Sequence, residues 1–192
     1  MNTDPGRASR LETAFRIRTA RRTDSAPLVR EMRGLARFEG YLESFAVTPR
    51  ELERRAFGRN AQCAIEVAEN VATGEILGYA VVLTTPYTYD LKPTLTLKEL
   101  YVEPDSRGCG VGKALMRAVA ARATALSAGR LRWDVLPGND RAEAFYQSLG
   151  GRRVENWIPY VMDEPTFTNL AASQPNRVEG RPRRPPRIRR ER

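Results

Sequence analysis

The chain has 192 residues and a formal net charge of +9 at pH 7, from 32 Lys and Arg against 23 Asp and Glu. That length suits a single domain whose core can fold without disulfides or a structural metal. The sequence contains no His, which excludes His-based catalytic triads and most zinc sites. We therefore expect no metal site.

The positive charge is concentrated at the C-terminal end. Between Arg177 and Arg192, eight Arg and two Glu contribute +6 of the net charge, so the rest of the chain carries only +3. A nearly balanced domain does not predict a nucleic-acid-binding face, and any contact with nucleic acid is left to the Arg-rich tail.

The two cysteines and the N-terminal sequence predict a cytoplasmic protein. Cys63 and Cys109 provide no disulfide framework, which favours a reducing, cytoplasmic setting. The first residues have no apolar signal-peptide core, and no apolar stretch approaches the roughly eighteen residues of a membrane span. We expect no membrane association.

Hydropathy patterning predicts the elements in chain order. A strand at 15–18 precedes a helix capped by Thr23 or Asp24, and a second, short helix begins where Thr48 caps and Pro49 takes the first helical position. Further elements are strands at 63–68, 76–83, 97–102 and 131–135, helices at 111–126 and 141–149, and a closing hairpin made from Val154 and residues 157–162.

The stretch from Leu97 to Leu115 organises the rest. A short apolar strand ends at Pro104, and small residues between Arg107 and Lys113 then open a helix with backbone N–H groups facing outward. Such a helix start is a ready site for phosphate. Arg122 falls on the apolar face of this helix, so its guanidinium must find a partner or reach the edge of that face.

Two better-known phosphate motifs do not fit this loop. A Walker-type loop would need Gly where Arg107 stands and Ser or Thr where Ala114 follows Lys113. A dinucleotide fingerprint would need its third Gly at Lys113 or Leu115.

The pattern Arg-x-x-Gly-x-Gly after a Leu-Tyr-Val strand resembles the acetyl-CoA motif of the GNAT N-acetyltransferase superfamily. The resemblance covers about residues 15–163 and is most like the spermidine/spermine N-acetyltransferase-like group. It rests on three segments: residues 35–39 with 48–52, residues 98–102 with 107–112, and residues 139–150, which match the family's Asn-x₅-Phe-Tyr-x₂-Leu-Gly signature.

The resemblance implies the fold and the domain plan. The fold would be α/β, the GNAT acyl-CoA N-acyltransferase fold, with a mixed central sheet of about six to seven strands and about four helices. The domain would span residues 14–165, between a disordered lead at 1–13 and a disordered Arg- and Pro-rich tail at 166–192. The family often forms homodimers, so a homodimer is expected.

The resemblance also implies site roles. The co-substrate would be acetyl-CoA, and Tyr146 would protonate the departing thiolate. The residues implied in cofactor binding are Leu100, Tyr101 and Val102 through their backbone, Arg107, Gly108, Cys109, Gly110, Val111, Gly112 and Lys113 around the pyrophosphate, and Asn139.

The general base is where this sequence departs from the family. Lys98 stands at the family's glutamate position, and strand alternation puts the following Glu99 on the opposite face unless a bulge re-aims it. Lys98 would repel a dication and could pair with a carboxylate of an amino-acid-like amine, or it could simply reach solvent. The base would be Glu99, or water relayed to Glu99, Glu39 or Asp90. Glu39 and Asp90 are also candidates for binding the amine.

Three functions follow from these residues. The first is an acetyl-CoA-dependent N-acetyltransferase acting on a primary amine of a small molecule, polyamine-like or amino-acid-like, by direct attack in a ternary complex. The second is a protein N-acetyltransferase that docks its partner through the basic tail. The third is a non-catalytic acyl-CoA-binding module, suggested only by the missing family glutamate at Lys98.

Overall fold

The computed structural model describes residues 14–87, 89–155 and 158–173. The chain divides into two compact units, residues 1–139 and 140–192, and each is described by itself. Within the described residues, no helix has both the length and the apolar composition needed to cross a membrane.

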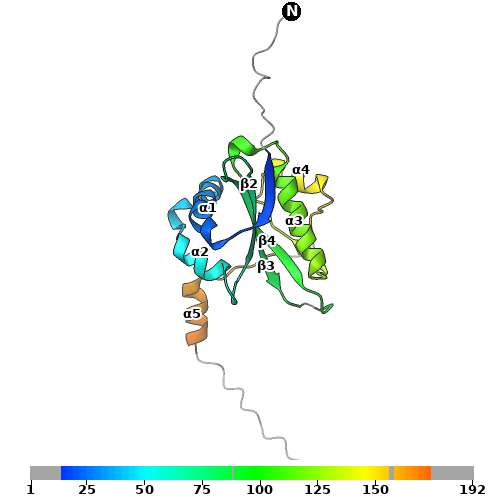
Figure 1. Cartoon of the computed structure of the whole chain (residues 1–192). Coiled ribbons are helices and arrows are strands. Elements are labelled where there is room, and N and C mark those ends of the chain that lie inside the picture. The colour runs from blue at the N-terminus through cyan, green and yellow to red at the C-terminus, as the bar shows by residue number, and fades with distance from the viewer. Residues whose placement is uncertain (1–13, 88, 156–157, 174–192) are drawn as a thin grey trace, which may run out of the picture. The chain divides into compact units, whose positions relative to one another are not determined.

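A five-stranded mixed sheet forms the centre of the first unit (Figure 1). Strands β1 to β4 are antiparallel neighbours in chain order, and β5 runs parallel to β4. The strands are β1 (Phe15–Thr19), β2 (Ala64–Asn70), β3 (Ile76–Thr85), β4 (Thr94–Val102) and β5 (Arg130–Arg132). The sheet is mixed as expected, but it has five strands rather than six to seven.

The missing strands are those of the expected closing hairpin. Val154 and residues 158–162 form no strand, and the remaining hairpin residue, 157, lies outside the described residues. A strand needs a partner for its N–H and C=O groups, and Pro159 has no N–H to offer. Tyr160 is 94% exposed, so the apolar composition that predicted the hairpin is not matched by burial.

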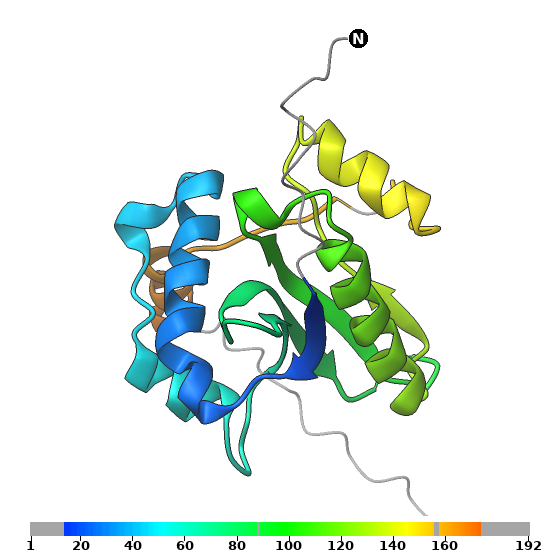
Figure 2. The ribbon, with the colours of Figure 1, turned by 45° about the horizontal axis from the view of Figure 1, so that its top comes forward.

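Helices cover both faces of the sheet in the first unit (Figure 2). Helices α1 (Ser25–Glu39) and α2 (Pro49–Ala56) lie on one face, and α3 (Val111–Ala125) lies on the other. The start of α2 confirms the predicted cap, because the Thr48 hydroxyl accepts a hydrogen bond of 3.2 Å from the Glu51 N–H. Short 3₁₀ turns occur at η2 (Arg22–Asp24), η3 (Leu42–Ser44) and η4 (Pro104–Ser106).

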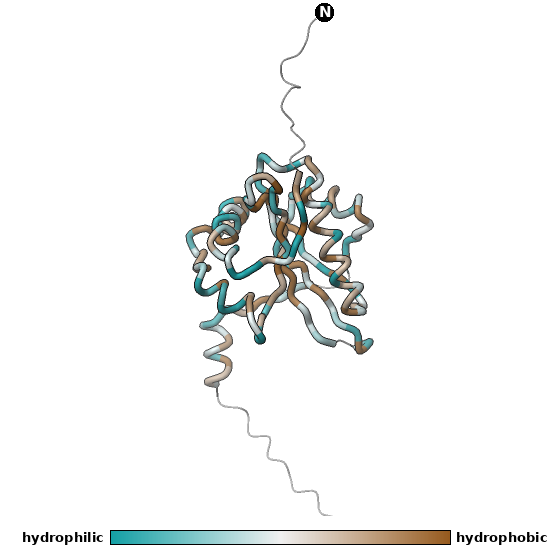
Figure 3. The backbone as a smooth tube through the Cα atoms, viewed as in Figure 1, coloured by the Kyte–Doolittle hydropathy of each residue, from teal (hydrophilic) through white to brown (hydrophobic). Residues whose placement is uncertain are grey.

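The central strands carry the apolar core (Figure 3). Under α1 and α2 the core includes Leu28, Leu35, Val67 and Tyr79, all at most 6% exposed. Leu115 on α3 is completely buried as well. Helix α1 therefore rests on β3 and β4, and its C-terminal end lies near the strand that carries Glu99.

Arg122 on α3 has the partner that the sequence required. Its Nε donates to Glu66 Oε1 at 3.0 Å, and its NH2 group forms an ion pair with the same oxygen. Glu66 lies on β2 and also accepts a hydrogen bond of 3.1 Å from the Thr19 hydroxyl. A buried carboxylate thus satisfies a cation placed on an apolar helix face.

The second unit contains α4 (Asp140–Ser148) and α5 (Glu164–Ala172). Helix α5 corrects two expectations, since it raises the number of α-helices to five in the described residues and extends into the tail expected to be disordered from residue 166. Its start follows local rules, with Asp163 at the N-cap and Pro165 in the first turn. Disorder was predicted from the average composition of residues 166–192, which does not take account of this local helix start. Residues 174–192 lie outside the described part of the chain.

Gly34 permits a close approach between α1 and β4. A Cβ placed on Gly34 would lie 2.5 Å from the Tyr101 hydroxyl oxygen and 2.9 Å from its ring carbon Cζ. Both distances are far inside van der Waals contact. Glycine is therefore required here by packing, and the rigid Tyr101 ring has little room to move in a dense core.

Replacing Gly34 by Ala should lower the free energy of unfolding by about 1–2 kcal/mol, since overpacking outweighs the helix propensity gained. Chemical denaturation measures the change. Arg30→Ala, an exposed position on the same helix, is the control and should be near neutral. A Gly34→Ala protein more stable than wild type would show that propensity outweighs the contact with Tyr101.

Candidate active site

A β-bulge in β4 decides which way Glu99 points. Val81 of β3 lies opposite Glu99. The next residue, Val82, lies opposite Leu97, so Lys98 is an extra residue without a counterpart. Val81 packs in the core with α1 and α2, and residues directly opposite each other on paired strands point to the same face of the sheet. Glu99 therefore faces α1, and the bulge considered from the sequence is present.

The side chain of Glu99 is hydrogen-bonded to a buried tyrosine on the neighbouring strand β3. The Tyr79 hydroxyl donates a hydrogen bond of 2.8 Å to Glu99 Oε2, and Tyr79 itself is 0% exposed. Burial raises the pKa of Glu99 above its ordinary value, while the Tyr79 hydrogen bond and the Lys98 charge oppose that rise and Glu39 adds to it. A carboxyl group with a raised pKa is a stronger base once it is ionised.

Glu39 and Lys98 lie in the same electrostatic neighbourhood as Glu99. Burial raises the pKa of Glu39, the last residue of α1, and the Lys98 ammonium lowers it. The pKa of Tyr41 is raised by burial and then by Glu99 and Glu39. Lys98 and Glu39 are exposed. The structure thus brings Glu39, Lys98 and Glu99 together, with the first two at the solvent side.

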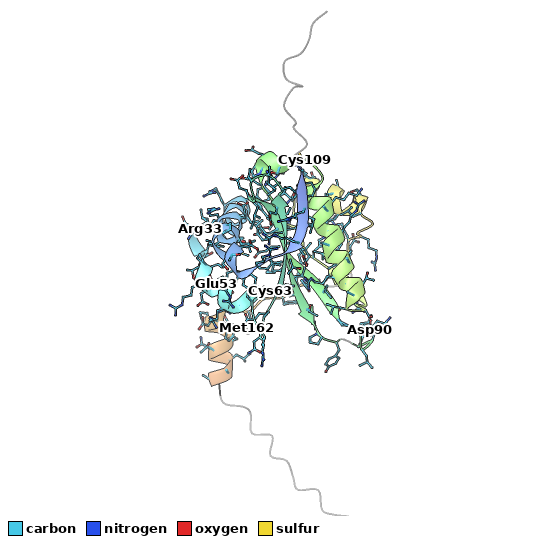
Figure 4. All side chains as sticks on the ribbon, in the orientation of Figure 1. Arg33, Glu53, Cys63, Asp90, Cys109 and Met162 are labelled. Carbon is cyan, nitrogen blue, oxygen red and sulfur yellow. The ribbon has the colours of Figure 1, made fainter. Side chains whose placement is uncertain are left out.

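Cys63 lies at the inner side of this neighbourhood. It precedes β2 and packs against the core under α1 and α2, where Figure 4 labels it. Burial raises the pKa of its thiol, and the charge of Glu99 raises it further. The thiol therefore stays protonated near neutral pH, and its place in the core explains the residue.

Strand β4 has an open edge next to Glu99. On one side it pairs with β3 along its length, but on the other side its ladder with β5 covers only residues 94–96 against 130–132. Within the described residues, the part of β4 from Leu97 to Val102 has no strand on that second side. An extended peptide-like group can pair with such an edge.

Hydrogen-bond alternation identifies the peptide groups at the open edge. The Glu103 N–H donates to the Leu77 carbonyl of β3 at 3.0 Å. Since pairing alternates in an antiparallel ladder, Tyr101 also turns its peptide groups toward β3, whereas Leu100 and Val102 turn theirs away. Of the three residues expected to bind through their backbone, Leu100 and Val102 thus present peptide groups at the open edge.

The glycine loop forms the N-terminal end of α3. Gly108 and Gly110 have φ values of +81° and +85°, which other residues rarely adopt. The first intrahelical bond runs from the Ala114 N–H to the Gly110 carbonyl at 3.0 Å. The N–H groups of Val111, Gly112 and Lys113 therefore have no partner within the helix and suit an anion.

The Arg107 side chain ties this loop to β4. Its Nε donates to the Val102 carbonyl at 2.9 Å, and its guanidinium lies over the rings of Phe38 and Tyr101, with 5.9 Å and 5.8 Å to their centroids. These contacts fix where the loop leaves the open edge. Cys109 is exposed on the same loop, and its sulfur lies 3.8 Å from the Arg107 carbonyl oxygen.

Asp90 lies away from the other acidic candidates. It belongs to the connection between β3 and β4, where it forms an ion pair of 2.8 Å with Arg130. Strand β4 begins at Thr94, about 13 Å of extended chain before Lys98. Figure 4 shows Asp90 and Cys109 at opposite ends of the first unit. The structure does not bring Asp90 together with Glu39 and Glu99.

Asn139 and Tyr146 lie at the junction in sequence between the two units. Asn139 ends the first unit, and its N–H donates to the Leu136 carbonyl at 3.1 Å. Tyr146 lies on α4 in the second unit, half-buried, with its ring edge-on to Phe145 at 5.1 Å between centroids. Its role stays a prediction.

Metal ligation finds no support in the described part of the chain, which contains no group of three or more Cys, Asp or Glu side chains arranged to hold an ion. The donors that do gather are backbone N–H groups at α3 and peptide groups along β4. They fit a phosphate-bearing molecule with an amide-containing arm, such as acetyl-CoA.

An open strand edge, an anion-binding helix start and a carboxyl group with a raised pKa are typical of a group-transfer enzyme with a phosphate-bearing co-substrate. The profile of the acetyltransferase (GNAT) family matches residues 27–151, and the chain belongs to this family. It is an acetyl-CoA-dependent N-acetyltransferase, so the family suggested by the sequence is confirmed.

Two curated relatives and one solved structure illustrate the similarity. Thialysine N-epsilon-acetyltransferase from Mus musculus is 32% identical over 165 residues, covering 81% of this chain and 96% of that protein. L-Ornithine N5-acetyltransferase from Arabidopsis thaliana is 27% identical over 82 residues, 43% of this chain and 36% of that protein. An integron cassette protein from the V. cholerae mobile metagenome has a TM-score of 0.70 at 23% identity, covers 83% of this chain and 98% of its own, and shares the fold.

Tyr79 is the site residue that the sequence did not indicate as functional. It reads as one more apolar position in the strand Ile76–Leu83. Its position across from Tyr101, with its hydroxyl on Glu99, depends on the register between β3 and β4 and on the bulge. A polar aromatic residue within an otherwise aliphatic buried strand is the one signal available, because a buried tyrosine hydroxyl needs a partner.

Proposed function

We propose that the protein transfers the acetyl group of acetyl-CoA to a primary amine of a small molecule, by direct attack of the amine in a ternary complex. The observation that carries this proposal is the bulge at Lys98, which turns the carboxyl group of Glu99 toward α1 beside the open edge of β4. Base and co-substrate edge are thus adjacent in one strand.

Acetyl-CoA supplies a thioester carbonyl that an amine can attack and a thiolate that can leave. An alkyl amine has a pKa near 10, so it arrives as a cation and must lose a proton. Glu99 accepts that proton, directly or through a bridging water. Tyr146 donates a proton to the departing sulfur, as the family resemblance implies.

The co-substrate is held along β4 and at the start of α3. The peptide groups of Leu100 and the N–H of Val102, whose carbonyl accepts from Arg107, pair with its amide-containing arm, and one of these two N–H groups meets the developing oxyanion. The N–H groups of residues 108–113 receive the pyrophosphate, and the α3 dipole adds to that attraction. Asn139 contacts the co-substrate near the gap between β4 and β5.

The acceptor is either polyamine-like or amino-acid-like, and Lys98 favours the second. The Lys98 ammonium group, at the solvent-exposed side of the site, attracts a carboxylate and repels a second cation. Glu39, which is also exposed and lies near Lys98, can bind the acceptor amine. The relatives named for thialysine and L-ornithine act on side-chain amines of amino acids, which agrees with this choice.

Lys98→Glu should shift the ratio of kcat/KM for L-ornithine over spermidine toward spermidine by about tenfold to a hundredfold, because the repulsive charge is reversed. Steady-state kinetics with both acceptors measure the ratio. Lys92→Glu makes the same charge change near Asp90 and should shift it far less. An unchanged ratio in Lys98→Glu would show that Lys98 reaches solvent without contacting the acceptor.

A panel of amines with acetyl-CoA tests the function as a whole. The panel contains polyamines, diamino acids, aminoglycosides and a peptide with a free N-terminus, and thiol release reports turnover. We expect release above the buffer rate with a small amine. Release with the peptide alone, or with no amine, would overturn the proposed function.

We also propose that the enzyme acts as a homodimer, as the family resemblance implies, in the cytoplasm, as its two cysteines favour, and without a metal ion, as the absence of His favours. Light scattering at micromolar concentration tests the dimer, and full turnover in the presence of a chelator tests the absence of a metal. Residues 174–192, which contain the Arg-rich tail, lie outside the described part of the chain.

A further inference from the structure

We infer that Tyr79 is a positioning residue for this reaction: its hydroxyl holds Glu99 Oε2 in place and leaves Oε1 as the oxygen that takes the acceptor's proton. The inference rests on the proposed function, in which Glu99 is the base. It adds a residue on β3, the neighbouring strand, to a site otherwise built on β4 and α1.

The geometry of Tyr79 suits this role. Its hydroxyl lies 2.8 Å from Glu99 Oε2, and its side chain is 0% exposed. The ring is packed in the core and lies 6.1 Å from the Tyr101 ring at an angle of 42°. A tyrosine has only two side-chain torsions and this one is closely packed, so the hydroxyl offers a fixed donor to a flexible glutamate side chain.

Other polar groups near Glu99 do not fix it in the same way. Among the described residues, Tyr79 provides the hydrogen bond to the Glu99 carboxylate, and the other groups act on it or on Tyr79 through charge. These groups are Lys98 on β4 and Glu39 and Glu31 on α1, while the neutral Tyr41 after α1 and Cys63 before β2 lie near enough for the Glu99 charge to raise their pKa values. Lys98 is exposed and carries its charge on a flexible stem.

The direction of the hydrogen bond is set by the surroundings. Burial raises the pKa of Tyr79 well above its ordinary value, and the charge of Glu99 raises it further. Tyr79 therefore keeps its proton and acts as the donor. A carboxylate that accepts from Tyr79 has used one oxygen, and its second oxygen keeps its lone pairs for the ammonium proton.

The bond also affects when Glu99 ionises. A hydrogen bond to the charged form favours that form, and here it opposes the rise in the pKa of Glu99 caused by burial. Without the Tyr79 hydroxyl, the pKa of Glu99 should be higher still. Removing the Tyr79 hydroxyl oxygen should thus change both the orientation of the Glu99 carboxylate and the pH range in which Glu99 is ionised.

Tyr79→Phe tests the inference in the full chain. We expect kcat/KM for the best amine of the panel to fall about tenfold at pH 7, and the low-pH limb of its pH profile to move to higher pH. The same substitution is made in a Glu99→Gln background as a double-mutant cycle. There it should have almost no further effect, because Tyr79 acts through Glu99.

Three outcomes separate the possibilities. A Tyr79→Phe profile with an unmoved low-pH limb, or an equal loss of rate in both backgrounds, would overturn the inference and leave a purely structural tyrosine. Carboxyl ¹³C NMR titration of Glu99, assigned with Glu99→Gln, follows the same pKa without turnover. If wild type turned over no amine while this titration still moved in Tyr79→Phe, the proposed function would fail and the contact alone would remain.

Discussion

Glu99→Gln is expected to lower kcat/KM for the acceptor amine by about 10²- to 10³-fold, the range of a lost general base. Glutamine keeps the size of the side chain and can still accept from the Tyr79 hydroxyl, so the packing under α1 should survive. It cannot take a proton from the amine. Initial rates of thiol release measure the loss, and calorimetric titration should give an unchanged dissociation constant for acetyl-CoA.

Glu31→Gln is the matched control for that substitution. Glu31 is a second partly buried carboxyl group on α1, and burial together with Glu103 raises its pKa to about 7. It lies two helical turns, about 12 Å, before Glu39. Its removal should leave the rate near wild type. A loss equal to that of Glu99→Gln would mean that the effect reflects any buried carboxyl group rather than a base.

The same pair separates a catalytic titration from a stability titration. As the proposed base, Glu99 must be ionised, so the rate should fall as pH drops through its raised pKa, at higher pH than for an ordinary glutamate. Glu31 has a folded pKa above its unfolded value of about 4.5, so it stabilises the fold at low pH and loses that contribution as pH rises toward 7. Glu31→Gln should remove this second dependence and leave the first.

The elements that the sequence predicted well are those with local signals. Thr48 and Pro49 predict the start of α2 to within two residues. Gly108 and Gly110 predict a backbone with positive φ, which other residues rarely adopt. The need of Arg122 for a partner was also predictable, since a cation on an apolar helix face has to be paired, and Glu66 is that partner. Such signals require no knowledge of which strands are neighbours.

What the sequence could not supply depends on pairing between distant strands. The bulge at Lys98 exists because Val81 and Val82 take Glu99 and Leu97 as partners. Nothing in residues 97–99 alone distinguishes that register from simple alternation. Tyr79 was missed for the same reason, and α5 was missed because composition was averaged over a long tail.

The bulge also explains how an enzyme of this family can lack the family's glutamate at position 98. A bulged strand exposes one extra side chain and turns the next one to the face it would otherwise not reach. Lys98 is exposed, and Glu99 is half-buried on the face that packs against α1. In the proposed mechanism, this one bulge lets Lys98 meet the charge of the acceptor and lets Glu99 take its proton.

Tyr146→Phe should lower kcat by about 10²-fold, because the departing thiolate would lose its acid. The loss should lie in kcat, with KM for the amine and the dissociation constant for acetyl-CoA near wild type, since the hydroxyl is needed only as the carbon–sulfur bond breaks.

Tyr160→Phe removes a hydroxyl from a tyrosine that is 94% exposed and serves as the matched control. Its kcat should equal that of wild type across the pH range. If Tyr146→Phe also turned over at the wild-type rate, water would be the source of the proton. Tyr146, which packs edge-on against Phe145, would then be a packing residue of α4, and the chemistry would rest on Glu99 and the open edge of β4.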